Sequence, residues 1–401
     1  IYGQNRFYTA KWQAAGVGLA DLRSLDDLAR FPLTRKKELM QAQADDPPFG
    51  TNATFPESEY IRVHQTSGTT GAPLKVVDTR QSWDWWGRCW AHVLAGAGLT
   101  AGDRVFLPFS FGPFIGFWAT VEGARQIGAL MIPGGGRDSL QRLQLMAEMG
   151  VTAMCCTPTY ALRLAEVARE EGFDLRQIPL RATIHAGEPG ASLPATKARI
   201  ESEWQAKCYD HAGASEVGAH SFECEAQPGG IHALESEFII ECLDPQTGEP
   251  AAPGERGELV ITNLGRPGYP VVRYKTGDLV LLNYKPCACG RTFARYEGGV
   301  LGRADDMVIV RGVNVYPAAV ENLIRQATAV DEFQITVYTR REMGELAIAL
   351  ELPAGSDPAE AREAVIRAVN HSLSLRPIVT VVERGTLPRF ELKARRFKVE
   401  Q

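Results

Sequence analysis

The chain has 401 residues, of which 45% are hydrophobic, and a formal net charge of -5. This length and apolar content suffice for a sizeable buried core and predict two or three domains. The acidic balance argues against nucleic acid or an anionic membrane as a partner. No apolar run reaches the length that predicts a membrane span.

The first residues and the cysteines indicate the cellular compartment. Residues 1–6 have neither the apolar core nor the small-residue cleavage site of a signal peptide. Because the chain starts without Met, we expect a short segment before Ile1. The eight cysteines are scattered and too few for a disulfide framework in a chain of this length. We therefore expect a cytoplasmic protein with reduced thiols.

The N-terminal part predicts helices followed by a loop rich in glycine and hydroxyls. Residues 6–45 are expected to be helical, with apolar positions in a polar background. Residues 65–76 read Gln-Thr-Ser-Gly-Thr-Thr-Gly-Ala-Pro-Leu-Lys-Val. The glycines let successive N–H groups converge on one anion, and the hydroxyls add donors. This composition predicts a phosphate-binding loop but is also typical of a solvated loop, and it lacks the GxxxxGK[ST] pattern.

Short apolar runs alternate with helical periodicity from about residue 100 to 190, and a β-rich region follows. The expected strands are 105–108, 129–132, 153–156 and 182–185, and the expected helices are 139–149 and 159–171. This alternation predicts a parallel α/β sheet covered on both faces, with ligands at the strand ends. Residues 230–300, with Pro-Gly turns between short runs, predict a small barrel or a distorted antiparallel sheet.

The last hundred residues predict a separate α+β unit. The expected elements are strands at 306–310, 333–338 and 345–351, and helices at 317–327 and 358–372. We place the domain boundary just after Arg303. The N-terminal domain is then 1–303 and the C-terminal domain 304–401.

Five further segments carry polar groups beside tight turns, at 186–190, 211–218, 273–278, 302–317 and 387–396. Glu216, set among small residues, is suited to a Mg²⁺ ion that bridges phosphates. Asp278, after a Thr-Gly turn, is suited to accepting both ribose hydroxyls. Each segment by itself is equally typical of a turn, a cap or a solvated charge run.

In their order and spacing these segments resemble the adenylate-forming acyl-CoA ligase superfamily, and specifically its phenylacetate-CoA ligase branch. The resemblance covers nearly the whole chain and rests on residues 67–71, 274–278, 302–306 and 311–317. It implies an α/β fold: a large N-terminal domain of doubly covered parallel sheets with a small β-barrel-like part, and a small mobile α+β C-terminal domain. The N-terminal domain would bind ATP and the acid, and the C-terminal domain would act as a lid.

The resemblance also implies an ATP-dependent carboxylic acid–CoA ligase, in which the acid becomes an acyl-adenylate and its acyl group then passes to coenzyme A. The implied small-molecule partners are the acid, ATP with Mg²⁺, and coenzyme A, and a homodimer is expected. One alternative is an adenylating enzyme with a non-CoA acceptor. A nucleotide-binding module without chemistry is another, but the presence of Lys393 and Glu216 argues against it.

Roles for the ATP site follow from the resemblance. Ser67, Gly68, Thr69, Thr70 and Gly71 would hold the β- and γ-phosphates, Ser215 would contact phosphate and Glu216 would bind Mg²⁺. Gly187, Glu188 and Pro189 would line the adenine slot, with stacking from His211 or elsewhere, because Ala212 replaces a common tyrosine. Asp278 would bind the ribose, with Arg303 close by.

The resemblance assigns the lid residues in the same way. Lys393 would bridge the attacking carboxylate and the α-phosphate, although Leu392 replaces the usual preceding glycine. Asp305 would be the hinge about which the lid rotates between the two half-reactions. Arg311, Gly312 and Tyr316 would then line the coenzyme A channel.

The aromatic run at 109–118 is either core or the wall of the acid pocket. The resemblance implies a pocket lined by Phe111, Phe114, Phe117, Ala186 and Gly187. Its flat apolar walls favour an aryl or arylacetic acid, and a small branched or hydroxylated acid is the alternative.

A closed set of thiols and one imidazole predicts a structural zinc site. Cys287 and Cys289 form a tight turn, and Cys224 and His232 lie in the same β-rich region. Cys242 is the alternative fourth ligand. Some members of the family branch carry zinc at this place.

Overall fold

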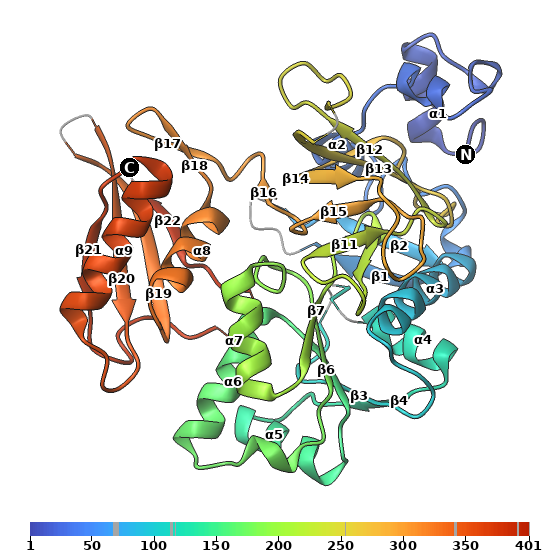
Figure 1. Ribbon diagram of the computed structural model, residues 1–401. Helices are drawn as coiled ribbons and strands as arrows, with labels where there is room; N and C mark the ends of the chain where they lie inside the picture. Colours follow the sequence, from blue (N-terminus) through green and yellow to red (C-terminus); the bar gives the residue numbers. More distant parts are fainter. Residues whose placement is uncertain are drawn as a thin grey trace.

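The computed structural model describes residues 1–66, 72–112, 115–116, 118–252, 254–340, 343–390 and 393–400. A large body, coloured blue to yellow and orange in Figure 1, lies beside a smaller C-terminal unit in orange to red. Within these ranges no helix combines the length and the apolar character needed to cross a membrane.

The N-terminal part is less helical than the sequence predicts. It contains helix α1 (Arg6–Ala14) and helix α2 (Lys36–Asp45), separated by two short 3-10 helices at Leu19–Asp21 and Asp26–Arg30. The prediction of one helical region over 6–45 is therefore wrong between the helices. Gly16, with φ of +68°, ends α1, and Pro32 lies in the extended segment before α2.

A five-stranded parallel sheet forms the centre of the body, in the order β4-β3-β5-β6-β7. Its strands are β3 (Arg104–Leu107), β4 (Leu130–Pro133), β5 (Ala153–Cys156), β6 (Ala182–His185) and β7 (Lys207–Asp210). The predicted strands at 153–156 and 182–185 are confirmed to the residue. The other two predicted strands are displaced by one residue.

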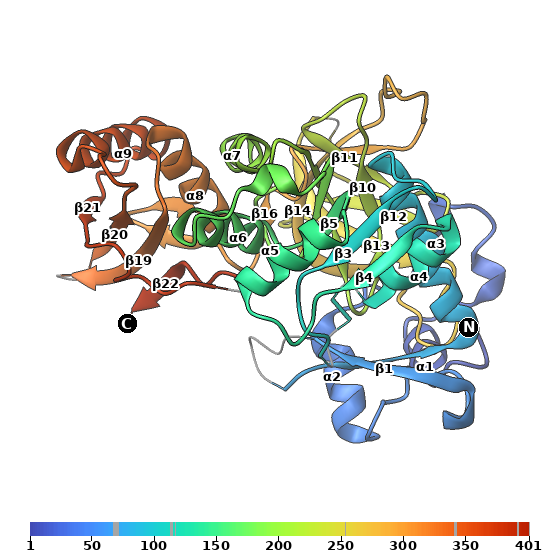
Figure 2. The same cartoon turned by 90° about the horizontal axis from the view of Figure 1, so that it is seen from below.

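Helices cover both faces of this sheet, as predicted, because alternate side chains of a strand point to opposite faces. Val105 and Leu107 of β3 belong to the core that includes α3 and α4, whereas Phe106 belongs to the core with α5, α6 and α7. Figure 2 shows the two helix layers on either side of β3 and β5. The helices are α3 (Arg80–Gly96), α4 (Trp118–Ile127), α5 (Ser139–Glu148), α6 (Pro158–Glu170) and α7 (Pro194–Trp204).

An antiparallel sheet fills the β-rich region, in the order β10-β11-β15-β14-β13-β12, with β16 beside β14. Its strands are β10 (Ser221–Glu223), β11 (Gly230–Ala233), β12 (Phe238–Leu243), β13 (Arg256–Asn263), β14 (Tyr274–Asn283), β15 (Arg295–Glu297) and β16 (Gly302–Arg303). Two short pairs complete the body: β1 (Tyr60–Gln65) with β2 (Lys75–Thr79), and β8 (Gly213–Ala214) with β9 (Gly218–Ala219).

The C-terminal unit has its own hydrophobic core, which includes Val320, Phe333, Ile348 and Val365. Its sheet has the order β21-β20-β19-β22 and is covered by α8 and α9. The elements are β17 (Val308–Val310), β18 (Val313–Val315), α8 (Pro317–Ala327), β19 (Glu332–Arg340), β20 (Met343–Glu351), α9 (Pro358–Leu373), β21 (Ile378–Val381) and β22 (Phe397–Glu400). The predicted domain boundary falls between β16 and β17 and stays a prediction.

Candidate active site

The predicted adenine-slot residues directly follow two neighbouring parallel strands. Residues 186–189 come after β6, and His211 comes after β7. Because β6 and β7 are paired in parallel, both segments leave the sheet at the same edge. The backbone N–H of His211 donates to the carbonyl of His185, which ties the two strand ends together.

The predicted catalytic lysine of the C-terminal unit reaches this edge of the sheet. Gly187 has φ of +95°, and a Cβ atom placed on it would lie 3.3 Å from Cε of Lys393. The backbone angle favours glycine here, whereas the flexible end of the lysine would have to shift only slightly to admit a methyl group. Lys393 is a solvent-exposed residue, but the protein around its ammonium group lowers its pKa, because the lost hydration outweighs the attraction of Glu188 and Glu216.

Glu216, the predicted magnesium ligand, is held by two partners. Its carboxylate accepts a 2.8 Å hydrogen bond from the Tyr274 hydroxyl and lies 3.4 Å from Nζ of Lys36. Burial and the neighbouring carboxylate raise the pKa of Tyr274, so the phenol keeps its proton and donates it. Lys36 was missed by the sequence reasoning. The Lys36-Lys37 pair at the start of α2 was the available signal.

Ser215, the predicted phosphate contact, is fixed through its backbone. Its carbonyl accepts a 2.8 Å hydrogen bond from Nη1 of Arg266. Arg266 is itself held by a buried ion pair with Asp78 at 2.7 Å. The loop that carries Ser215 and Glu216 is thereby attached to the core.

The predicted ribose residue, its neighbouring arginine and the predicted hinge form one network. Strands β14 and β16 place Asp278 opposite Arg303, with 3.2 Å between the carboxylate and Nη1. Arg303 also donates two hydrogen bonds of 2.9 Å to Asp305. Burial raises the pKa of Asp278 to about 6, against the opposing effect of Arg303. Gly277 allows this packing, since a Cβ atom there would lie 2.7 Å from the guanidinium.

His211 and Ala212, predicted to lie near adenine, belong to a well-packed corner. His211 is 4% exposed, meets Trp90 edge-on at 4.7 Å between ring centroids, and its Nδ1 donates to the Ser221 carbonyl at 2.6 Å. Burial lowers the pKa of His211 to about 4, so the ring is neutral. The N–H of Ala212 donates to the Ser221 hydroxyl at 2.9 Å.

The predicted phosphate loop and acid pocket are described in part. Ser67, Gly68, Thr69, Thr70, Gly71, Phe114 and Phe117 lie outside the described residues. Of the described pocket residues, Phe111 packs on Trp118 with 4.3 Å between ring centroids, and Ala186 is half-buried against the same core. The guanidinium of Arg62 lies 5.7 Å from the Trp118 ring, so a cation borders this aromatic cluster.

The predicted coenzyme A residues belong to the C-terminal unit. Arg311 and Gly312 form the turn between β17 and β18, with φ of +51° and +81°, and Arg311 forms an ion pair with Glu345 of β20. Tyr316 immediately precedes α8 and lies against Gly302, where a Cβ atom would be 3.7 Å from its ring.

Arginine–carboxylate pairs join the C-terminal unit to α6 and α7 of the body. Glu166 of α6 accepts a 3.0 Å hydrogen bond from Arg389, and Arg199 of α7 lies 3.4 Å from Asp331. The hydrophobic cores of the body and of the C-terminal unit remain separate clusters. We name this polar contact the arginine interface.

The four predicted metal ligands lie together. The Sγ atoms of Cys224, Cys287 and Cys289 and a nitrogen of His232 are all within 4.8 Å of one another. Cys224 and Cys287 are 3.6 Å apart, and Cys289 is 3.5 Å from Nε2 of His232. The alternative ligand, Cys242, lies elsewhere on β12, near the Val280 carbonyl.

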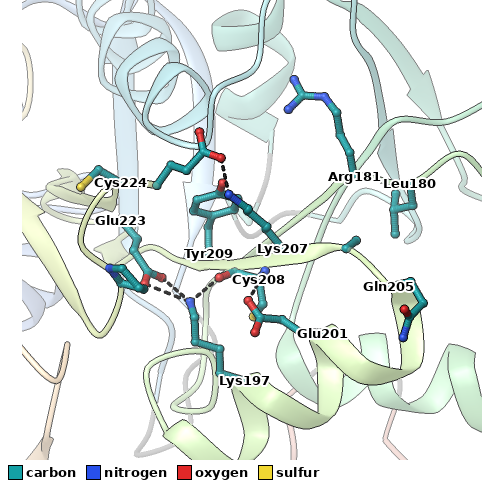
Figure 3. A pocket seen from close by; sticks show the side chains of 13 residues that line it. Leu180, Arg181, Lys197, Glu201, Gln205, Lys207, Cys208, Tyr209, Glu223 and Cys224 are labelled. Carbon is teal, nitrogen blue, oxygen red and sulfur yellow. Dashed lines mark hydrogen bonds and ion pairs between the residues drawn. The ribbon is translucent and has the colours of Figure 1, made fainter. Parts of the chain in front are cut away.

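A hollow of about 550 Å³ lies beside β7 and α7, away from these sites (Figure 3). Lys197 crosses it and binds both carboxylate oxygens of Glu223 at 2.9 Å. The hollow contacts Cys224 of the thiol cluster but none of the predicted nucleotide residues. Its basic and acidic groups largely neutralise each other, so we do not assign the nucleotide to it.

Two family matches agree with this geometry. The AMP-binding enzyme family matches residues 25–265, and the AMP-binding enzyme C-terminal domain matches residues 312–400. The chain belongs to the AMP-binding enzyme family. The resemblance inferred from the sequence motifs is thus confirmed.

Individual relatives indicate which type of AMP-binding enzyme this chain is. Phenylacetate-coenzyme A ligase of Thermus thermophilus is 33% identical, over 98% of this chain and 91% of the relative. That of Escherichia coli is 34% identical, over 96% and 88%. The chain is an AMP-forming acid–CoA ligase of the phenylacetate-CoA ligase type.

Solved structures confirm the predicted fold class, and two states of one ligase differ in how well they match the arrangement of the two units in this chain. A structure of 2-hydroxyisobutyryl-CoA ligase in the postadenylation state with 2-HIB-AMP is 32% identical and has a TM-score of 0.94, over 99% of this chain and 86% of that one. The thioesterification state of that ligase, with 2-HIB-AMP and CoA, gives 0.74 at 33% identity over the same shares. The two sequence identities are nearly equal, so the difference in TM-score reflects how the two units are arranged. The arrangement in this structure is closer to that of the postadenylation state.

Proposed function

We propose that this enzyme activates an aryl or arylacetic acid with ATP and transfers the acyl group to coenzyme A. The observation that carries the proposal is the position of Lys393 from the C-terminal unit against Gly187 at the sheet edge. A lysine brought there from a separate unit suits a reaction in which a cation is needed for one step only.

Lys393 would bridge the carboxylate of the acid and the α-phosphate of ATP. Attack of the carboxylate on phosphorus forms the acyl–phosphate bond and expels pyrophosphate, so two anions must approach each other. A preorganised cation offsets their repulsion and stabilises the charge on phosphorus. The catalytic contribution of Lys393 is therefore electrostatic.

Glu216 would hold Mg²⁺, and Ser215 would contact phosphate. The Glu216 carboxylate fits this use because Mg²⁺ takes one or two carboxylates together with phosphate oxygens. Lys36, at 3.4 Å from that carboxylate, adds positive charge where the triphosphate would arrive. When bound, the ion would neutralise charge on the leaving pyrophosphate. The loop at 67–71 would hold the β- and γ-phosphates.

The remaining nucleotide residues keep their predicted roles in this proposal. Asp278 would accept the ribose hydroxyls, and Arg303 would lie beside ribose and phosphate. The network of Arg303 with Asp278 and Asp305 supports this, because one arginine contacts both the ribose residue and the hinge. Rotation at Asp305 would withdraw Lys393 and bring Arg311, Gly312 and Tyr316 toward the coenzyme A channel.

The thiol cluster would hold a structural zinc ion. Zn–S and Zn–N bonds of about 2.3 and 2.0–2.1 Å in a tetrahedron put ligand atoms about 3.5–3.8 Å apart. The separations of 3.6 Å for Cys224–Cys287 and 3.5 Å for Cys289–His232 fit this requirement. Four protein ligands leave no position for substrate, so the ion would stabilise the fold.

The identity of the acid has two candidates. The packing of Phe111 on Trp118 favours an aromatic acid, as in the phenylacetate ligases. The high similarity to a 2-hydroxyisobutyryl-CoA ligase favours a small branched or hydroxylated acid instead. Carboxylate-dependent exchange of pyrophosphate into ATP, measured over a panel of both acid types, decides between them.

The acceptor is tested separately from the acid. AMP release that depends on coenzyme A supports the proposal. AMP release that depends only on an amine or a carrier protein would show that this compound, and not coenzyme A, is the acceptor. No exchange with any acid would remove the proposed function. The homodimer and the cytoplasmic location stay predictions.

A further inference from the structure

Glu188 joins the body to the C-terminal unit through both oxygens of its carboxylate. Oε1 accepts a 2.9 Å hydrogen bond from the backbone N–H of Thr159, near the start of α6. Oε2 accepts a 2.7 Å hydrogen bond from the backbone N–H of Ala394, 206 residues later in the chain. Ala394 directly follows Lys393, so this carboxylate holds the segment that carries the lysine.

Two hydrogen bonds orient the Glu188 carboxylate. The N–H of Thr159 at the α6 N-terminus would otherwise lack an intrahelical acceptor, and the positive end of the helix favours a negative partner. With one oxygen fixed there, the other points to Ala394. Burial raises the pKa of Glu188, and the nearby Arg396 and the two N–H donors oppose that shift.

Other contacts secure the same segment on both sides of the lysine. Nη1 of Arg396 donates a 3.1 Å hydrogen bond to the Thr159 hydroxyl, and Arg389 binds Glu166. Both partners belong to α6, the helix whose first turn is bound by Glu188. Contacts of Arg389 and Arg396, which flank Lys393 in the sequence, thus hold the segment that carries the flexible lysine side chain.

We propose that Glu188 is a positioning residue that seats Lys393 for adenylation through the backbone N–H of Ala394. The geometry supports this use, because Cε of Lys393 lies against Gly187, the residue next to Glu188. A shift at residue 394 therefore moves the lysine relative to the site directly. The inference rests on the proposed role of Lys393.

The contact belongs to one arrangement of the two units. When the C-terminal unit rotates for thioester formation, Ala394 leaves Glu188 together with Lys393. Loss of the contact should then slow adenylation and spare acyl transfer to coenzyme A. A residue that merely supports the fold would not separate the two half-reactions.

The first test is Glu188→Gln, which keeps the shape but places an NH₂ group against one of the two N–H donors. With the best acid of the panel, we expect pyrophosphate exchange to fall about ten-fold, a typical cost for an unpaired polar group. Coenzyme A transfer from the matching synthetic acyl-adenylate should stay within about two-fold. In a Lys393→Ala background the substitution should have no further effect on exchange.

The matched control is Glu170→Gln, which alters an interface carboxylate bound to Arg384 at 3.3 Å rather than to the lysine segment. It should keep both rates within about two-fold. If Glu188→Gln does not fold, Ala394→Pro removes the donor N–H from the other side and leaves the Thr159 contact intact.

The outcomes separate this inference from the proposed function. Unchanged exchange in Glu188→Gln or Ala394→Pro, or an equal loss in both half-reactions, overturns the positioning role alone. An absence of exchange in the unaltered enzyme overturns the proposed function itself. A selective loss of adenylation that disappears in the Lys393→Ala background supports the inference.

Discussion

Arg266 and Asp78 form a two-point ion pair, with distances of 2.7 and 2.8 Å, in which neither side chain is exposed to solvent. The pair lies 188 residues apart in the sequence and connects β2 to the segment after β13. Through its third contact, Arg266 holds the Ser215 carbonyl. A structural pair in the core thus determines the position of the loop that carries Glu216.

Removing the Asp78 carboxylate should be strongly destabilising. Asp78→Ala leaves the guanidinium buried without its counter-charge, and such losses cost about 3–5 kcal/mol of unfolding free energy. Urea unfolding followed by tryptophan fluorescence measures this change. Arg176→Ala, which breaks an exposed pair with Asp174, is the control and should change the unfolding midpoint little.

Lys393→Ala should separate the two half-reactions. Without the ammonium, the repulsion between the acid and the α-phosphate is not offset, and we expect pyrophosphate exchange to fall by at least about 100-fold. Transfer of the acyl group from a supplied acyl-adenylate to coenzyme A should be largely kept. A comparable loss in both reactions would contradict the assigned role.

ATP binding should strengthen as the pH rises through about 6. The raised pKa of Asp278 means that its carboxylate is mostly protonated below this value, and only the ionised form accepts both ribose hydroxyls. The apparent KM for ATP at pH 5.5 should therefore be about four-fold higher than at pH 7.5. Asp278→Asn should raise KM and flatten this dependence, and a mutant with an unchanged pH profile would count against the ribose contact.

Cys287→Ser should release the metal. With one of four ligands replaced, zinc content measured by atomic emission should fall from about one ion per chain, and the thermal midpoint should fall with it. Cys242→Ser, outside the cluster, should alter neither quantity. An unaltered enzyme without zinc would refute the site.

Much of the fold follows from local patterns. Helix α8 begins at Pro317 and ends at Ala327, as predicted, because proline suits the first helical turn and the apolar spacing continues to the end. The strands β5 and β6 are fully buried four-residue segments: β5 is apolar throughout, and β6 alternates apolar residues with the buried Thr183 and His185. The N-terminal region was mispredicted because scattered apolar residues pack on other elements, as Leu28 and Phe31 do near Val272.

Candidate site residues could be proposed from the sequence only where they form short motifs. Glu216, Asp278 and Lys393 each belong to such a segment. The pairs Lys36–Glu216 and Glu188–Ala394 join segments far apart in the chain, and no local periodicity records such a pair. One sequence therefore gives the residue types of the site but not the partners that orient them.

The arginine interface has a consequence for the proposed rotation of the C-terminal unit. When the two units separate, water can hydrate the carboxylate and guanidinium groups of these ion pairs. Separation of the ion pairs therefore exposes charged rather than apolar groups. An apolar interface would hold the two units together more strongly, and when they separated it would expose an apolar patch that promotes self-association. In the rotation proposed for the C-terminal unit, these ion pairs would break and expose mainly charged groups to water.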